Sequence, residues 1–157
     1  MVIRRAQERD IPAVAHLLEQ VARVHATGRP DIHRPGGVKF TVPELAEQLK
    51  GPVFVAELEG SVVGHCFCKI ICHGDSQSTV AHSSLYIDDL CVDENCRRQG
   101  VGRALYRHAR AYAAAQGLDS VTLNVWAFNT AAMEFYASMG MSQQRIIMED
   151  RLNAETQ

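Results

Sequence analysis

The stretch Arg97-Arg98-Gln99-Gly100-Val101-Gly102-Arg103 separates an apolar run that ends at Val92 from an amphipathic run that begins near Val101. This order predicts a strand, a glycine-rich turn and a helix. Glycine lets a backbone approach a ligand closely, and the first N–H groups of a helix have no intrahelical acceptors. With arginines beside them, these N–H groups predict a site for phosphate oxygens. We call residues 97–103 the glycine–arginine loop.

Two well-known phosphate loops do not fit this stretch. A nucleoside triphosphate-binding P-loop continues with Gly-Lys-Ser or Gly-Lys-Thr, whereas Gly102 is followed by Arg103 and Ala104. A dinucleotide-binding fingerprint lies early in a βαβ unit and has a third glycine, near the position that Tyr106 takes here. Both triphosphate hydrolysis and dinucleotide binding are therefore disfavoured. Taken alone, the loop could also be a simple connection with solvated arginines.

Length and composition are those of one domain. The chain has 157 residues, 46% of them hydrophobic, so we expect a single domain over residues 1–157 that needs no metal or disulfide. A net charge of −2 makes nucleic acid an unexpected partner. The five cysteines are odd in number and lack metal-ligand spacing, which favours a reducing compartment and no metal site. Without an apolar run that could span a bilayer, we expect a cytoplasmic protein with no membrane partner.

Hydrophobic periodicity predicts a mixture of strands and helices. The expected strands cover residues 2–5, 53–58, 61–72, 85–92, 120–126 and 145–152, and the expected helices begin after Asp10, at Thr41, near Val101 and at Asn129. Glu59-Gly60 predicts a tight hairpin turn, and residues 25–40 predict a long loop of the kind that often binds ligands. With only one clear β-α-β crossover, the fold class is α+β, a mixed α/β arrangement with a central, mostly antiparallel sheet flanked by helices.

Two stretches carry a family resemblance. Asp89-Leu90-Cys91-Val92 followed by the glycine–arginine loop is similar to a fourth strand and an R/Q-x-x-G-x-G/A pyrophosphate loop. Residues 129–141 are similar to the signature N-x-x-A-x-x-F-Y-x-x-x-G-F, with Met141 in place of the last phenylalanine. Both belong to the GNAT superfamily of acyl-CoA-dependent N-acetyltransferases, which the chain resembles over almost its whole length. The resemblance implies a GNAT-like single domain splayed between its fourth and fifth strands, with acetyl-CoA as cosubstrate.

The resemblance also implies cofactor contacts. In the family the pantetheine arm enters between the splayed strands and pairs with free backbone groups, which here implies Leu90, Cys91 and Val92. The diphosphate would lie on the glycine–arginine loop, and Asn129 would be both a helix cap and a cofactor contact. Family members are often dimers, so a homodimer is one open possibility for this chain.

Acetyl transfer needs a base for the amine and an acid for the leaving thiolate. An alkylamine with a pKa of about 10.4 is neutral about once in a few thousand molecules at pH 7, a cost of about 4–5 kcal/mol. The candidate bases are Asp88 and Asp89, and Asp88 is preferred because it matches a glutamate that some family members use. Tyr136 resembles the tyrosine that protonates the departing sulfur. Alternatively, either aspartate is an ordinary strand residue and Tyr136 a core aromatic.

The acceptor amine is not identified by the sequence. Family position implies contacts from His25, Asp31 and His33 in the long loop region and from Trp126, although each could be an ordinary solvated or packed side chain. A small-molecule amine and a peptide amine both remain open. No cysteine has an evident nucleophile setting, so we expect direct transfer in a ternary complex, with Cys91 the candidate for a relay. The alternative function is a non-catalytic acyl-CoA sensor or interaction module.

Overall fold

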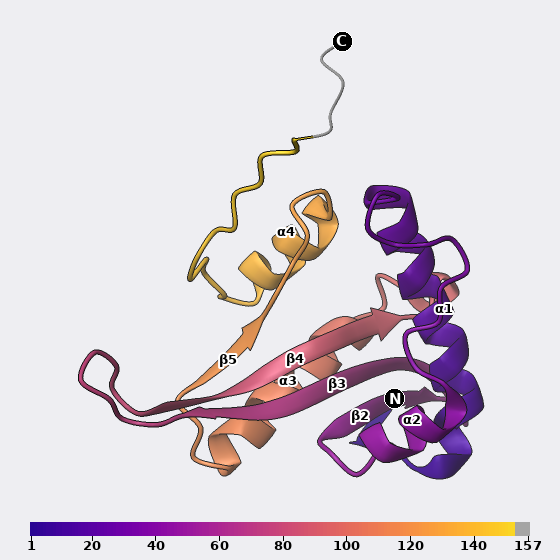
Figure 1. Ribbon diagram of the computed structural model, residues 1–157. Coiled ribbons are helices and arrows are strands. Elements are labelled where there is room, and N and C mark those ends of the chain that lie inside the picture. The colour runs from indigo at the N-terminus through magenta and orange to yellow at the C-terminus, as the bar shows by residue number, and fades with distance from the viewer. Residues whose placement is uncertain (153–157) are drawn as a thin grey trace. The chain divides into compact units, whose positions relative to one another are not determined.

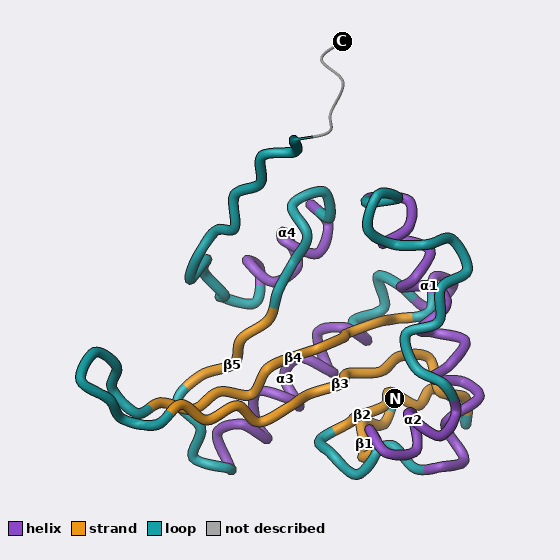
Figure 2. The backbone as a smooth tube through the Cα atoms, viewed as in Figure 1, coloured by secondary structure: helices purple, strands orange, loops and turns teal. Residues whose placement is uncertain are grey.

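The structure is a computed structural model that describes residues 1–152 (Figures 1 and 2). These residues form two compact units that divide between Asn124 and Val125. The first unit contains β1 (Val2–Arg5), a 3-10 helix (Glu8–Asp10), α1 (Ile11–Gly28), α2 (Val42–Gln48), β2 (Val53–Leu58), β3 (Ser61–His73), β4 (His82–Val92), a second 3-10 helix (Glu94–Cys96), α3 (Val101–Ala115) and β5 (Ser120–Leu123). The second contains α4 (Thr130–Ser138). Every helix in the described part of the chain is too short or too polar to cross a membrane.

One five-stranded sheet is the frame of the first unit. Its order is β1-β2-β3-β4-β5, and all neighbours are antiparallel except β4 and β5, which are parallel. Glu59 and Gly60 join β2 to β3 with φ values of +51° and +82°, as a two-residue hairpin turn requires. The predicted turn and the predicted fold class, a mixed and mostly antiparallel sheet with flanking helices, are confirmed.

Helices cover both faces of this sheet, and the alternation of side chains along β2 shows how. Val53 and Val55 share a buried cluster with Val14 of α1 and Leu45 of α2. Phe54, between them, points to the other face and meets His108 of α3 edge-on, with 4.7 Å between ring centroids. Successive strand residues face opposite sides, so α1 and α2 cover one face and α3 the other (Figure 1).

Strand β5 covers only part of β4. Their parallel pairing runs from Ser84 opposite Ser120 to Ile87 opposite Leu123, where β5 ends. Beyond this point β4 continues to Val92 and pairs only with β3, and Figure 2 shows β4 extending past β5. The predicted splay between the fourth and fifth strands is therefore present. It leaves one edge of β4 without a strand partner among the described residues.

Some strand boundaries differ from the sequence prediction. β3 and β4 extend to His73 and His82, which pair across the hairpin and stack with 4.5 Å between ring centroids. The strand predicted over residues 145–152 is wrong, because residues 141–152 have no regular structure and Ile146 and Ile147 are largely exposed. A β-prone run becomes a strand only when another strand pairs with its backbone, and within residues 1–152 none does.

Candidate active site

The glycine–arginine loop is an exposed turn that leads into α3. Gly100 is the N-cap residue of the helix with φ +82°, and Arg98 has φ +64°, so both adopt the left-handed conformation. The first intrahelical bond runs from the Ala104 N–H to the Gly100 carbonyl at 3.0 Å. The N–H groups of residues 101–103 precede this bond and have no intrahelical acceptor. A Cβ on Gly100 would meet no atom within 4 Å, so a ligand can approach these N–H groups.

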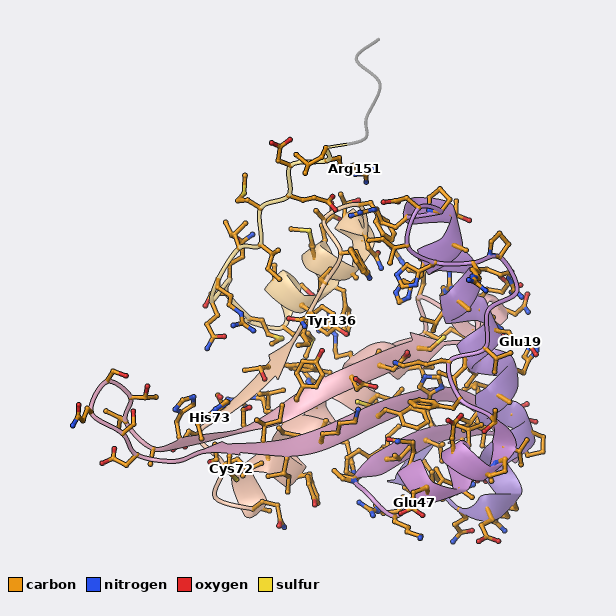
Figure 3. All side chains as sticks on the ribbon, viewed as in Figure 1. Glu19, Glu47, Cys72, His73, Tyr136 and Arg151 are labelled. Atoms are coloured by element: carbon orange, nitrogen blue, oxygen red, sulfur yellow. The ribbon has the colours of Figure 1, made fainter. Side chains whose placement is uncertain are left out.

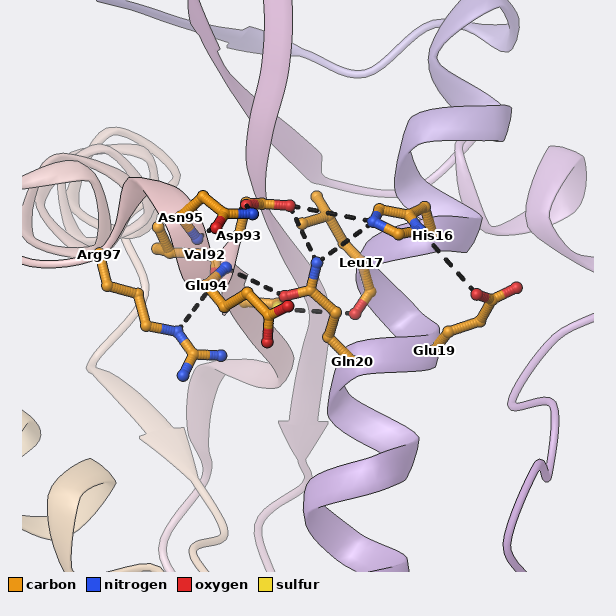
Figure 4. Close-up of polar contacts among 10 residues, drawn as sticks. His16, Leu17, Glu19, Gln20, Val92, Asp93, Glu94, Asn95 and Arg97 are labelled. Carbon is orange, nitrogen blue, oxygen red and sulfur yellow. Dashed lines mark hydrogen bonds and ion pairs between the residues drawn. The ribbon is translucent and has the colours of Figure 1, made fainter.

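A polar network fixes the start of this loop to α1 (Figure 4). The buried Gln20 donates from Nε2 to Asp93 Oδ2 at 2.9 Å, and its Oε1 accepts the Glu94 N–H at 3.1 Å. The Arg97 guanidinium donates from Nε to the Val92 carbonyl at 3.3 Å. Gln20 therefore helps to position the loop. No sequence pattern indicates this role, because a glutamine on a helix resembles any solvated residue.

A β-bulge on β4 brings two neighbouring carboxylates to the same place. Ile87 and Asp89 pair with consecutive residues of β3, so Asp88 is an extra residue without a partner there. In a regular strand, neighbouring side chains point to opposite faces. At the bulge, the Oδ2 atoms of Asp88 and Asp89 both contact Lys39 Nζ, at 3.2 and 3.0 Å. The two candidate bases thus share one cation, which the sequence did not indicate.

Asp89 is a buried carboxylate that keeps its charge. Its side chain is 3% exposed, and its Oδ1 lies 3.0 Å from Nε2 of the fully buried His65 on β3. Burial opposes the charge, but His65 and Lys39 more than offset burial and hold the pKa of Asp89 below its ordinary value. Burial also opposes the charge of Lys39, and the carboxylates of Asp89 and Asp88 reverse this and raise the pKa of its ammonium. At neutral pH, Asp89 is therefore ionised and Lys39 protonated.

A cavity of about 330 Å³ lies between α1 and the long loop that follows it. Its wall is mostly apolar, and two imidazoles and the stem of a lysine complete it. Two of the predicted acceptor contacts, His25 and His33, line this cavity, and their ring centroids lie 5.0 Å apart. Burial, together with the charge of His33, lowers the pKa of His25, which favours a neutral ring. Asp31 lies outside the lining and forms an ion pair with Arg29 at 2.8 Å. The lining residues are Leu18, Val21, Ala22, His25, His33, Arg34, Gly37, Val38 and Lys39.

The Cys91 thiol is packed against α1. Its Sγ donates to the Leu17 carbonyl at 3.5 Å. Burial raises the pKa of Cys91 to about 12. Because a thiol with this pKa forms almost no thiolate at neutral pH, this environment disfavours a nucleophilic role for Cys91.

The second unit carries the other predicted site residues. Asn129 is the N-cap residue of α4, and its Oδ1 accepts the Ala132 N–H at 3.2 Å, so the predicted cap is confirmed. Tyr136 lies on α4 (Figure 3), half-buried, with its ring edge-on to Phe135 at 5.0 Å between centroids. Trp126 stacks on Phe128 in the segment before α4.

A splayed mixed sheet whose fourth strand runs into a glycine–arginine loop at the start of a helix is the arrangement that the resemblance to the acyl-CoA-dependent N-acetyltransferases predicts. The family model described as the acetyltransferase (GNAT) family matches residues 18–141. The chain therefore belongs to this family.

Three proteins illustrate the similarity in sequence and fold. The chain is 31% identical to a mutant of the BH1408 protein from Bacillus halodurans, whose crystal structure superimposes with a TM-score of 0.93 and covers 97% of this chain and 99% of that one. An uncharacterized N-acetyltransferase from Methanocaldococcus jannaschii is 31% identical over 96 residues, which are 60% of this chain and 40% of that protein. The aminoglycoside N-acetyltransferase AAC(6′)-Iy, solved in complex with CoA, shares the fold at 15% identity, with a TM-score of 0.69 over 98% of this chain and 100% of that one.

The curated relatives are longer than the matched region. This chain spans 40%, 38% and 30% of the lengths of the three that it matches.

Proposed function

We propose that this protein is an N-acetyltransferase that moves the acetyl group of acetyl-CoA to a primary amine by direct attack in a ternary complex. The observation that carries the proposal is the presence, within one unit, of the glycine–arginine loop, the unpaired edge of β4 and the paired carboxylates of Asp88 and Asp89. They offer an anion site for a diphosphate, a backbone edge for the pantetheine arm and a carboxylate that can act as a base.

The proposed cosubstrate fits the residues that are present. The N–H groups of residues 101–103 have no intrahelical acceptor, and the arginines of the loop are exposed, which suits a diphosphate. Backbone groups of Leu90, Cys91 and Val92 lie on the edge of β4 beyond the end of β5 and can pair with the pantetheine amides as a strand would. We therefore assign the diphosphate to the glycine–arginine loop and the pantetheine arm to the end of β4.

Asp88 is the proposed base. Asp89 is buried and is held in its charged form by His65 and Lys39, so it is a poor proton acceptor. Asp88 is more exposed and sits on the bulge, where an acceptor can reach it. In the proposed step Asp88 takes a proton from the ammonium of the acceptor, the nitrogen bonds to the acetyl carbon, and the carbon–sulfur bond breaks. Tyr136 gives its proton to the departing thiolate and regains one from the attacking nitrogen, which must lose a second proton to become the neutral amide, and Asp88 releases its proton to solvent. The role of Tyr136 rests on the resemblance of its signature.

Acetyl-CoA should be incubated with small amines, polyamines, aminoglycosides and peptide N-termini while free thiol release is followed, and the products identified by mass. We expect transfer to at least one amine class, with kcat lowered about 100-fold or more in Asp88→Asn. Asp89→Asn is the matched variant, because it removes the neighbouring carboxylate and leaves the proposed base, Asp88, in place. CoA binding without transfer to any amine would instead support an acyl-CoA sensor, and the absence of CoA binding would refute both functions.

A further inference from the structure

The bulge on β4 already holds a complete ammonium site. Lys39 Nζ lies 3.0 Å from Asp89 Oδ2, 3.2 Å from Asp88 Oδ2 and 3.3 Å from the Asp88 carbonyl oxygen. An alkylammonium has three N–H donors and no acceptor, so these three oxygens match its hydrogen-bonding capacity. Two of them are charged, which makes the bonds strong. The position is therefore suited to any primary alkylammonium.

The cation at this position does not come from the sheet. Lys39 belongs to the irregular segment between α1 and α2 and reaches the bulge with a side chain that is 35% exposed. Its partners lie on a strand, where Asp89 keeps a second contact to His65 through its other oxygen. Withdrawal of Lys39 would thus leave Asp89 hydrogen-bonded to His65, and Asp88 would keep its contact to Lys69 at 3.5 Å. Lys39 lies in a segment without sheet pairing, so its backbone as well as its side chain can move without breaking a strand ladder.

We infer that Asp88 and Asp89 bind the ammonium group of the acceptor, and that the Lys39 ammonium occupies this position until the acceptor displaces it. The part of the inference that makes the bound amine an acetyl acceptor rests on the proposed function, whereas amine binding at this position can be tested without it. Lys39 also lines the cavity beside α1, whose wall includes Leu18, Val21 and Val38. The acceptor class is therefore a primary alkylammonium joined to an apolar body that this cavity can hold.

Exchange of one ammonium for another at this position keeps the two hydrogen bonds and the ion pair to Asp88 Oδ2, so it has little intrinsic cost. Binding of a free amine is hindered because Lys39 is covalently attached to the protein, and a group held by a short flexible segment has an effective concentration on the order of millimolar. A free amine must compete with Lys39 at that concentration. Removal of the Lys39 side chain should therefore strengthen amine binding by a factor of one plus the ratio of that effective concentration to the Kd of the amine for the vacated site, and a gain of about tenfold corresponds to a Kd of about 0.1 mM.

The probe for this test is n-butylammonium, which corresponds to the Lys39 side chain cut from its Cα. Its binding to wild type and to Lys39→Ala is measured by calorimetry without acetyl-CoA, with butan-1-ol as the neutral probe of the same size. We expect n-butylammonium to bind Lys39→Ala about tenfold or more tightly than wild type, and butan-1-ol to show no such gain. Lys69→Ala is the matched control, since Lys69 lies 3.5 Å from the other oxygen of Asp88 and is outside the three-oxygen position.

Equal binding of n-butylammonium to wild type and Lys39→Ala, or an equal gain in Lys69→Ala, would overturn the inference. Lys39→Arg keeps the cation and should bind the probe as weakly as wild type does. Lys39→Gln, which retains an apolar stem, serves the same test if the alanine variant does not fold. With acetyl-CoA added, we expect the KM for n-butylamine to fall in Lys39→Ala. Tighter binding of the probe, together with no acetyl transfer to any amine of the panel above, would leave this inference standing and refute the proposed function.

Discussion

At Gly64, β3 packs closely against α3, and replacement of this glycine by alanine tests that packing. A Cβ at this position would lie 2.9 Å from the Cys91 carbonyl oxygen, 3.1 Å from Leu105 Cδ1 and 3.3 Å from Val101 Cγ1. The first of these atoms is backbone of the neighbouring strand and cannot move without disturbing the sheet. Overpacking of this kind costs about 1–3 kcal/mol in the free energy of unfolding.

Urea unfolding followed by circular dichroism measures this cost, and an unchanged m value shows that the transition itself is the same. Gly74→Ala is the matched control, because a Cβ there meets nothing within 4 Å and no unusual φ is involved. We expect that control to lie within about 0.5 kcal/mol of wild type. Because Val101 begins α3, Gly64→Ala should also weaken CoA binding. A Gly64→Ala variant as stable as Gly74→Ala would refute the close approach of β3 and α3.

Three other changes address the loop, the proposed acid and the N-terminal ion pair. Gly100→Ala forces alanine to φ +82°, so this variant should bind CoA more weakly than wild type. Gly117→Ala is the control, because it bears a similar strain, φ +69°, beyond the other end of α3 and should weaken CoA binding less. Equal Kd values for CoA in the two variants, measured by calorimetry, would count against the loop as the CoA-binding site. Tyr136→Phe should lower kcat and leave the Kd for CoA nearly unchanged, and an unaltered kcat would remove Tyr136 from its role. The Arg4 guanidinium, 2.7 Å away, holds the pKa of the buried Asp10 below its ordinary value of about 3.9. This stabilisation is present above that value and is lost as pH falls through the lower folded pKa. Asp10→Asn should therefore destabilise the protein in urea at pH 7, and the difference from wild type should shrink as pH falls below about 3.9.

The parts of the fold that could be predicted are those set by neighbouring residues. Glu59-Gly60 forms a tight turn through its own backbone preferences, and Asn129 caps α4 through a bond to a residue three positions away. The glycine–arginine loop is local in the same sense. The run that includes Ile146 and Ile147 has an equally clear local pattern, yet it forms no strand, because strand formation depends on a partner that the pattern does not specify.

The centre of the candidate site could be predicted only in part. Asp88 and Asp89 were found, but regular alternation would place their carboxylates on opposite faces, and the bulge that brings them together has no signature in the sequence. Lys39 and His65 were missed for a related reason. Each contacts Asp89 from a distant part of the chain, with sequence separations of 50 and 24 residues. A lysine in a polar loop and a histidine in an apolar strand give no sign of a shared partner.

The central claim is that backbone N–H groups at the start of α3 bind the diphosphate of CoA. An NMR titration of the 15N-labelled protein with CoA tests this claim most directly, because it reports on each amide separately. We expect the largest amide shifts at Val101, Gly102 and Arg103, with smaller shifts along the end of β4. CoA binding that leaves these three amides unshifted, or no binding at millimolar CoA, would contradict the claim.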